Sequence, residues 1–169
     1  MPTAQDVIEH FGLTPLPFEG GMWGQSYRSR EILPLSATSG RYAGAKPMGT
    51  AIYYLLTDHP DSFSAMHRLR SDEVFHFYMG DPVEMLNLRG PIAETVTLGH
   101  DFENGETPVH VVARHTWQGC RLKPGGQWAL MGTTMAPGYT DTDFVPGVRD
   151  ELIRYYPRYA EIITALTRE

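Results

Sequence analysis

The chain has 169 residues, of which 41% are apolar and 20% charged, and this globular balance excludes a disordered chain. Its apolar stretches, such as 51–56, are far shorter than the roughly 20 residues of a membrane-spanning helix, so we expect no membrane segment. The formal net charge of −6 and the scattered Lys and Arg residues argue against a nucleic-acid partner, because phosphate binding depends on clustered basic side chains.

The length is that of one compact domain, and we predict a single domain over residues 1–169. The first residues show no basic region followed by an apolar run, so a cytoplasmic location is expected. Cys120 is the only cysteine, which excludes an intramolecular disulfide framework and a thiolate-rich zinc site. We expect a buried, inert thiol there.

The first elements in chain order are a short helix and a strand. Thr3, followed by an apolar pattern at helical spacing, predicts an N-cap and a helix that ends at Gly12. A Pro- and Gly-containing stretch then breaks helical structure. We predict a strand over 23–30 and a loop over 33–46.

Short β-type runs separated by turn residues dominate from Thr50 to about Ala136. Many short strands without helices between them predict an antiparallel sandwich or barrel. The barrel core should cover about residues 20–146. The predicted strands are 51–56, 74–78, 83–88, 94–98, 109–112, 116–122 and 128–134.

The tail, over about 147–169, changes to a helical period. Leu152, Ile153 and Tyr156 recur at three and four residues, as do the apolar residues of 162–166, and Pro157 lies between the two groups. This pattern predicts two short helices, or one kinked helix, packed on the barrel.

The most informative stretch is 67–80. Its His67, Glu73 and Gly80 have the spacing of the first motif of the cupin superfamily, which the stretch resembles, and Leu69 stands where that motif has its second His. The second cupin motif would end on a His in a Pro-x-Gly-x-x-His pattern, and Gln118 takes the place of that His.

The chain is most similar to a cupin subgroup long filed as a domain of unknown function, cupin type five. The matching stretches are Phe18-Glu19-Gly20-Gly21, 67–77, Trp117-Gln118 and Ala136-Pro137-Gly138, although Phe18 stands where Pro is usual. The resemblance implies a mainly all-β fold, the cupin double-stranded β-helix or jelly-roll barrel, with a short N-terminal helix and C-terminal helices. It also implies a homodimer.

The motif residues permit three interpretations. Alternation places residues 67 and 69 on one side of a strand with Glu73 entering from the next strand, so His67, Glu73 and Gln118 could hold a divalent metal. One imidazole, one carboxylate and an amide are a weak set, and no cofactor is firmly implied. Alternatively, His67 and Glu73 are catalytic, with His67 as general base oriented by Glu73. They could also be a buried pair that satisfy each other.

Further residues are candidates for binding a ligand. Tyr54 is the one of two adjacent tyrosines expected to point inward, and Tyr139 could close the pocket. Trp117 and Gln118 would offer a stacking face and an amide, and Glu19 could reach the pocket rim. His76 should face away from Glu73 on a regular strand, and would join the pocket only through a bulge.

The leading hypothesis is therefore a small-molecule enzyme of the cupin fold. We expect an epimerase, isomerase or lyase that transfers a proton on a carbohydrate- or nucleotide-like ligand, with His67 as base and a tyrosine as opposing acid. The alternatives are a non-catalytic module that binds a small metabolite and a metal-dependent oxygenase or lyase. Turnover separates the first two, and metal analysis tests the third.

Overall fold

The computed structural model describes residues 2–38 and 40–168. Its first element is α1 (Ala4–Phe11), which begins after Thr3 as predicted. The Thr3 hydroxyl accepts a hydrogen bond from the Asp6 N–H, and the Asp6 carboxylate accepts one from the Thr3 N–H. Gly12 ends the helix with φ of +61°. These reciprocal bonds stabilise a helix start whose N–H groups have no other partners.

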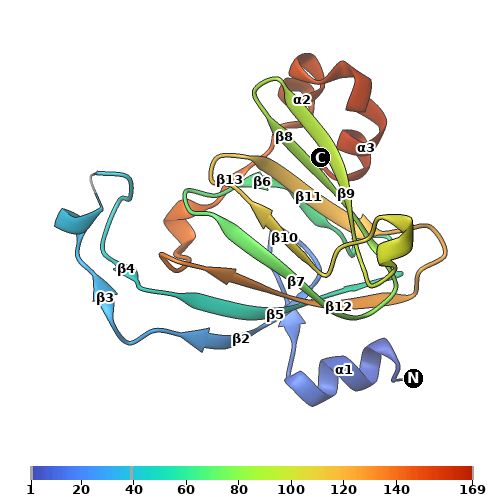
Figure 1. Cartoon of the computed structure of the whole chain (residues 1–169), viewed down its shortest axis with the longest axis horizontal. Coiled ribbons are helices and arrows are strands. Elements are labelled where there is room, and N and C mark those ends of the chain that lie inside the picture. The colour runs from blue at the N-terminus through green and yellow to red at the C-terminus, as the bar shows by residue number, and fades with distance from the viewer. Residues whose placement is uncertain (1, 39, 169) are drawn as a thin grey trace.

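Within residues 2–38 and 40–168, the strands form two large antiparallel sheets and a separate short pair, β3–β4 (Figure 1). The first sheet has the order β1-β2-β5-β12-β7-β10. Its strands are β1 (Thr14–Pro15), β2 (Met22–Arg28), β5 (Thr50–Thr57), β7 (Glu73–Gly80), β10 (Val109–Val112) and β12 (Trp128–Met135).

The second sheet has the order β13-β6-β11-β8-β9 and faces the first across a shared apolar core, which makes the jelly-roll barrel. The predicted mainly β class and cupin architecture are thereby confirmed. The strands of this sheet are β6 (Ser64–Arg68), β8 (Val83–Arg89), β9 (Ile92–Leu98), β11 (Trp117–Leu122) and β13 (Val145–Pro146).

Strands of both sheets bury both of their faces. On β5, Tyr54 and Leu56 point into the barrel core, whereas Leu55 belongs to a cluster with Val7 of α1 on the outer side. On β8, Met85 faces the core. The apolar runs that predicted these strands are therefore continuous rather than alternating, because helices cover the outside of the sheets.

The tail forms two short helices, which is one of the two arrangements that its period predicted. They are α2 (Arg149–Tyr155) and α3 (Ala160–Ala165), joined by the 3-10 turn η4 (Pro157–Tyr159). Their Leu152 and Ile163 pack with Leu86 of β8 on the outer face of the second sheet. Figure 1 shows these helices over β8 and β9, and α1 lies against the first sheet.

The stretch 33–46, predicted as a loop, also contains short regular elements. These are β3 (Ile32–Leu33), which pairs with β4 (Lys46–Pro47), and the 3-10 turn η1 (Leu35–Ala37). Two further 3-10 turns are η2 (Phe102–Asn104) and η3 (Asp141–Asp143). In the part of the chain that the structure describes, none of the helices has the length and apolarity needed to span a membrane.

Candidate functional site

A cavity of about 680 Å³ is lined mainly by strands of the first sheet. Side chains of β2, β5, β7 and β12 form its wall. The segment 16–19, here called the rim, and the segment 139–144, here called the roof, complete the lining. Its described lining side chains are Leu16, Pro17, Phe18, Glu19, Trp23, Gln25, Arg28, Thr50, Ile52, Tyr54, Leu69, Glu73, Thr133, Met135, Tyr139, Thr140, Asp141 and Phe144. This mixture of a largely apolar wall and a few polar groups is typical of a small-molecule site.

Glu73, the first residue of β7, carries a buried carboxyl group into this wall and is 7% exposed. The Gln118 amide donates a hydrogen bond of 2.6 Å to its Oε2. Burial raises the pKa of the Glu73 carboxyl, and the negative charge of Glu19 raises it further, against a smaller opposing effect of His67. The cavity therefore holds a carboxyl group that is more easily protonated than an exposed one.

His67 on β6 lies behind the wall rather than in it. It is 1% exposed and lies outside the set of described side chains that line the cavity. Its Nδ1–H donates to the Ala65 carbonyl at 2.7 Å, because a carbonyl oxygen can only accept. The ring stacks on Phe144 of the roof, with centroids 5.0 Å apart. These two contacts fix the orientation of the imidazole ring.

Gln118 joins the two motif residues. It pairs with His67 across β11 and β6, and its Nε2 lies 3.4 Å from the Nε2 of His67 as well as bonding to Glu73. The two amide N–H groups can thus serve an imidazole lone pair and a carboxylate at once. The result is a buried line from His67 through Gln118 to Glu73, with only its carboxyl end on the cavity.

The donor set does not fit the metal that full cupin motifs imply. The amide N–H groups of Gln118 take the lone pairs of His67 Nε2 and Glu73 Oε2 that a metal would need. Leu69, on the cavity wall, supplies no ligand atom. The Oε1 of Gln118 is buried without a hydrogen-bond partner among the described residues, but one amide oxygen is a weak donor. No group of three His, Cys, Asp or Glu side chains within residues 2–38 and 40–168 is arranged to hold a metal.

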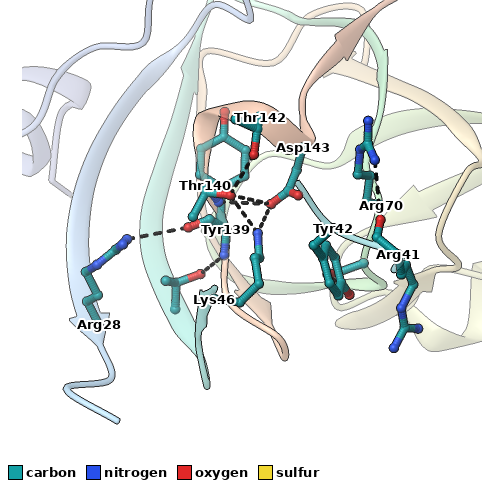
Figure 2. Close-up of polar contacts among 11 residues, drawn as sticks. Arg28, Arg41, Tyr42, Lys46, Arg70, Tyr139, Thr140, Thr142 and Asp143 are labelled. Atoms are coloured by element: carbon teal, nitrogen blue, oxygen red, sulfur yellow. Dashed lines mark hydrogen bonds and ion pairs between the residues drawn. The ribbon is translucent and has the colours of Figure 1, made fainter. Parts of the chain in front are cut away.

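A buried ion pair between Lys46 and Asp143 links the roof to β4 (Figure 2). The Lys46 ammonium of β4 contacts the carboxylate of Asp143 and donates to the Thr140 hydroxyl at 2.8 Å. Burial lowers the pKa of Lys46, and Asp143 opposes that shift. The Thr140 N–H also donates to Asp143, at 2.9 Å. This cluster fixes the backbone that carries Tyr139 and Phe144 into the cavity.

Several predicted ligand-binding residues do line the cavity. Tyr54 is the inward tyrosine of its pair, and its hydroxyl donates to the Gly20 carbonyl at 2.9 Å. Glu19 lies at the rim, where its Oε1 accepts from the Ser64 hydroxyl at 2.9 Å. Burial raises the pKa of the Tyr139 phenol, with smaller effects from nearby carboxylates, so the phenol keeps its proton.

Three predicted ligand-binding residues lie outside the described cavity lining: Gln118, which contacts Glu73 from behind the wall, His76 and Trp117. His76 follows Glu73 on β7 with odd spacing, so it faces the other side, and its Nε2 is 2.7 Å from the Thr134 hydroxyl. Trp117 is adjacent to Gln118 on β11 and therefore points outward, toward the cluster under α2 and α3. The Arg68 guanidinium lies over its ring at 4.5 Å. The alternation of side chains along β7 and β11 explains the positions of His76 and Trp117.

Sequence reasoning missed the residues that build the roof and part of the wall. Lys46 and Asp143 are far apart in the chain, and nothing in their neighbours indicates that they meet. Thr133 could have been found, because it lies on a predicted strand, and its side chain lines the same cavity as the Glu73 carboxyl. Phe144 and Arg28 carry no sequence pattern that marks them as lining residues.

The barrel and the position of this site define a cupin. The chain belongs to the family described as Cupin superfamily (DUF985), whose model matches residues 5–145. This confirms the resemblance drawn from the motifs. Curated proteins give no match to the chain.

Solved structures give the same result for the fold. A protein from Shewanella oneidensis is 28% identical over 99% of each chain, with a TM-score of 0.85. A hypothetical protein from Leishmania major is 26% identical over 99% of this chain and 100% of its own, with a TM-score of 0.87. An L-ribose isomerase from Cellulomonas parahominis is 13% identical over 72% of this chain and 63% of its own, with a TM-score of 0.54, and at that identity the likeness shows the barrel alone.

Proposed function

We propose that this chain is a proton-transfer enzyme, an isomerase, epimerase or lyase, that acts on a small carbohydrate-like ligand in the barrel cavity. The observation that carries the proposal is the buried Glu73 carboxyl, which reaches the cavity wall while being hydrogen-bonded from behind by Gln118. A perturbed carboxyl in a largely apolar cavity is a common feature of acid–base sites.

In this proposal Glu73, rather than His67, meets the ligand, because His67 lies behind the wall with both ring nitrogens engaged. The ionised carboxylate removes a proton from a carbon next to a carbonyl group, and the negative charge moves to the carbonyl oxygen. In an epimerisation Glu73 then returns the proton to the same carbon. In an isomerisation it returns the proton to the former carbonyl carbon, while the neighbouring hydroxyl becomes the carbonyl and its proton passes to the other oxygen. In a lyase reaction the electron pair instead expels a hydroxyl group from the next carbon, which leaves as water with the proton from Glu73. A raised pKa suits both steps, since a base works best when its pKa lies near the operating pH.

Three further side chains, Tyr139, Gln118 and His67, would assist Glu73 in this reaction. The protonated Tyr139 phenol lines the cavity and is the candidate acid for the ligand oxygen. Gln118 holds the Glu73 carboxylate in place, and His67 accepts the other N–H of that amide. His67 is therefore proposed as a positioning residue.

The charge of the cavity narrows the substrate class. Among the described lining side chains, Glu19, Glu73 and Asp141 supply carboxyl groups, whereas Arg28 supplies the only guanidinium. A phosphorylated ligand would meet more repulsion than attraction there. We therefore favour an unphosphorylated sugar or an amino sugar over a nucleotide. The L-ribose isomerase of similar fold shows only that such a barrel can host a sugar reaction.

The test is hydrogen exchange in D2O. Wild type would be incubated with a panel of unphosphorylated aldoses, amino sugars and sugar phosphates in the presence of EDTA, and the signal of the proton next to the carbonyl followed by ¹H NMR. We expect exchange with an unphosphorylated member, slowed by about 10²–10⁴-fold in Glu73→Gln.

The same experiment separates the alternatives. Binding of a panel member without exchange would replace the proposal by a non-catalytic small-metabolite-binding protein. Exchange that requires added Mn²⁺ or Fe²⁺ and disappears with EDTA would favour a metal-dependent enzyme. Exchange unchanged by Glu73→Gln would contradict the role of that carboxyl.

A further inference from the structure

The rim residue Phe18 is held in an unusual backbone conformation. Its φ is +67°, and the N–H of Glu19 donates to the carbonyl of Pro17 at 2.8 Å, which closes a γ-turn around Phe18. Two further bonds enclose this turn, from Gly20 N–H to the Leu16 carbonyl and from Leu16 N–H to the Gly21 carbonyl, both 3.0 Å. A γ-turn with positive φ at its centre is rare and strained.

The side chain of Phe18 adds a second unfavourable feature. It lines the mouth of the cavity and is 85% exposed, the highest exposed fraction among the large apolar side chains that the structure describes. A bulky residue at positive φ is a conformational outlier, and an exposed aromatic ring loses the benefit of burial. Neither feature stabilises the fold. Such strain persists where the surroundings enforce it, commonly at ligand-binding sites.

Arg168 enforces this conformation from the opposite end of the chain. Its guanidinium donates to the carbonyls of Phe18 at 3.2 Å, Glu19 at 3.4 Å and Asp61 at 3.1 Å. The same group stacks over the Phe63 ring at 4.2 Å. The planar guanidinium can make several fixed hydrogen bonds at once, so it fastens the turn to the barrel.

The adjacent residue links the turn to polar recognition. Glu19, next to Phe18, also lines the cavity, and its carboxylate is held by the Ser64 hydroxyl. One turn thus presents an apolar ring and a carboxylate to the same space. This pairing matches a sugar ring, which has an apolar C–H face and hydroxyl or ammonium groups at its edge.

We propose that Phe18 is a ligand-contacting specificity residue that packs its ring on the apolar face of a sugar in the cavity, and that Arg168 is the positioning residue for it. This inference rests on the proposed function, since it assumes a ring-shaped ligand beside Glu73. Proline, which the family resemblance puts at this position, is confined to φ near −65° and could not adopt the turn. The contact is therefore a feature of this chain's own sequence.

The test compares Phe18→Gly with wild type in binding and in stability. The same sugar panel is titrated into each protein by isothermal titration calorimetry, and thermal unfolding is recorded. We expect Phe18→Gly to bind the best panel member about three- to tenfold more weakly, because an aromatic contact is removed. Its Tm should be equal to or higher than that of wild type, because glycine tolerates positive φ. Phe102→Ala, an exposed aromatic in η2 outside the described cavity lining, should leave affinity unchanged.

Arg168 is tested by a double-variant cycle. Arg168→Gln should weaken binding in wild type but add nothing in the Phe18→Gly background, because both changes act through the same ring. If Arg168 had only a general structural role, Arg168→Gln would lower the affinity equally in wild type and in Phe18→Gly. That result would overturn the assignment of Arg168 as the positioning residue for Phe18.

The outcomes distinguish this inference from the proposed function. If wild type binds a sugar and Phe18→Gly binds it equally well, the role of Phe18 is wrong while that of Glu73 stands. If wild type binds no member of the panel, both are overturned. Weaker binding by Phe18→Gly without loss of Tm supports the inference even when no member is turned over.

Discussion

Asp143 in the roof and Glu73 in the wall are both carboxyl groups removed from water, at 1% and 7% exposed, yet their partners differ. Asp143 contacts a buried ammonium group, Lys46, and also accepts hydrogen bonds from Thr140. Glu73 receives a hydrogen bond from a neutral donor, the amide of Gln118, and the Thr133 side chain lines the same cavity. A buried charge with an opposite partner serves the structure, whereas a buried acid with neutral partners keeps the freedom to gain and lose a proton.

The largest expected effect comes from breaking the roof pair. Lys46→Met leaves the Asp143 carboxylate buried without its cation and should lower the free energy of unfolding by about 3–5 kcal/mol. Urea unfolding monitored by circular dichroism measures this. The matched control is Lys46→Met with Asp143→Asn, which removes both charges but keeps an acceptor for Thr140, and it should regain most of the loss. A single variant as stable as wild type would show that the pair is not structural.

The next largest effect is expected on metal affinity, when the missing histidines of the cupin motifs are introduced. Leu69→His combined with Gln118→His supplies the two imidazoles absent from the cupin motifs, next to His67 and Glu73. We expect this variant to bind Mn²⁺ or Ni²⁺ about 100-fold more tightly than wild type, measured by isothermal titration calorimetry. If wild type bound the metal as tightly as this variant, Gln118 could not be a hydrogen-bond donor to both His67 and Glu73.

A smaller effect is expected on the stability of the wall. Burial raises the pKa of Glu73 in the folded protein. The protonated carboxyl therefore contributes favourably to the free energy of unfolding at pH values below the pKa of the unfolded chain, which is about 4.3. This contribution is lost as the pH rises through the folded-state pKa. Glu73→Gln should therefore be more stable than wild type at pH 8, by about 0.5–2 kcal/mol, and the gain should vanish near pH 4. Urea unfolding at both pH values tests this. A variant that is less stable at pH 8 would contradict the account of the wall.

The smallest effect is expected at a partly exposed ion pair. Arg121 and Glu84 meet at 3.1 Å on neighbouring strands, with side chains 37% and 26% exposed. Glu84→Gln should change the free energy of unfolding by less than about 1 kcal/mol, because water screens such pairs. A loss as large as that of Lys46→Met would show that burial does not explain the difference between the pairs.

Sequence reasoning succeeded where local patterns decide the structure. Turn residues and apolar runs predicted β5, β7, β8 and β12, and Thr3 and Pro157 marked the helices correctly. Trp117 could also have been excluded from the cavity from the sequence, because it alternates with Gln118 on one strand. Each of these features depends on residues close together in the chain.

The site was less accessible from the sequence because its parts come from distant segments. The spacing of the motif found Glu73 and Gln118, but it could not show that the amide occupies the lone pair of His67. The ion pair between Lys46 and Asp143 and the hydrogen bond from Arg168 to the Phe18 carbonyl form only when distant segments meet in the folded protein. Both are single contacts between segments whose neighbours carry no matching pattern.

The central claim is that the Glu73 carboxyl is buried on the cavity wall with neutral partners and titrates above the usual range. The most direct measurement is a ¹³C NMR titration of protein labelled at the glutamate side-chain carboxyl, with the Glu73→Gln spectrum used to assign the resonance. The account predicts a Glu73 midpoint clearly above the ordinary glutamate pKa of about 4.3. A midpoint at or below that value would contradict it.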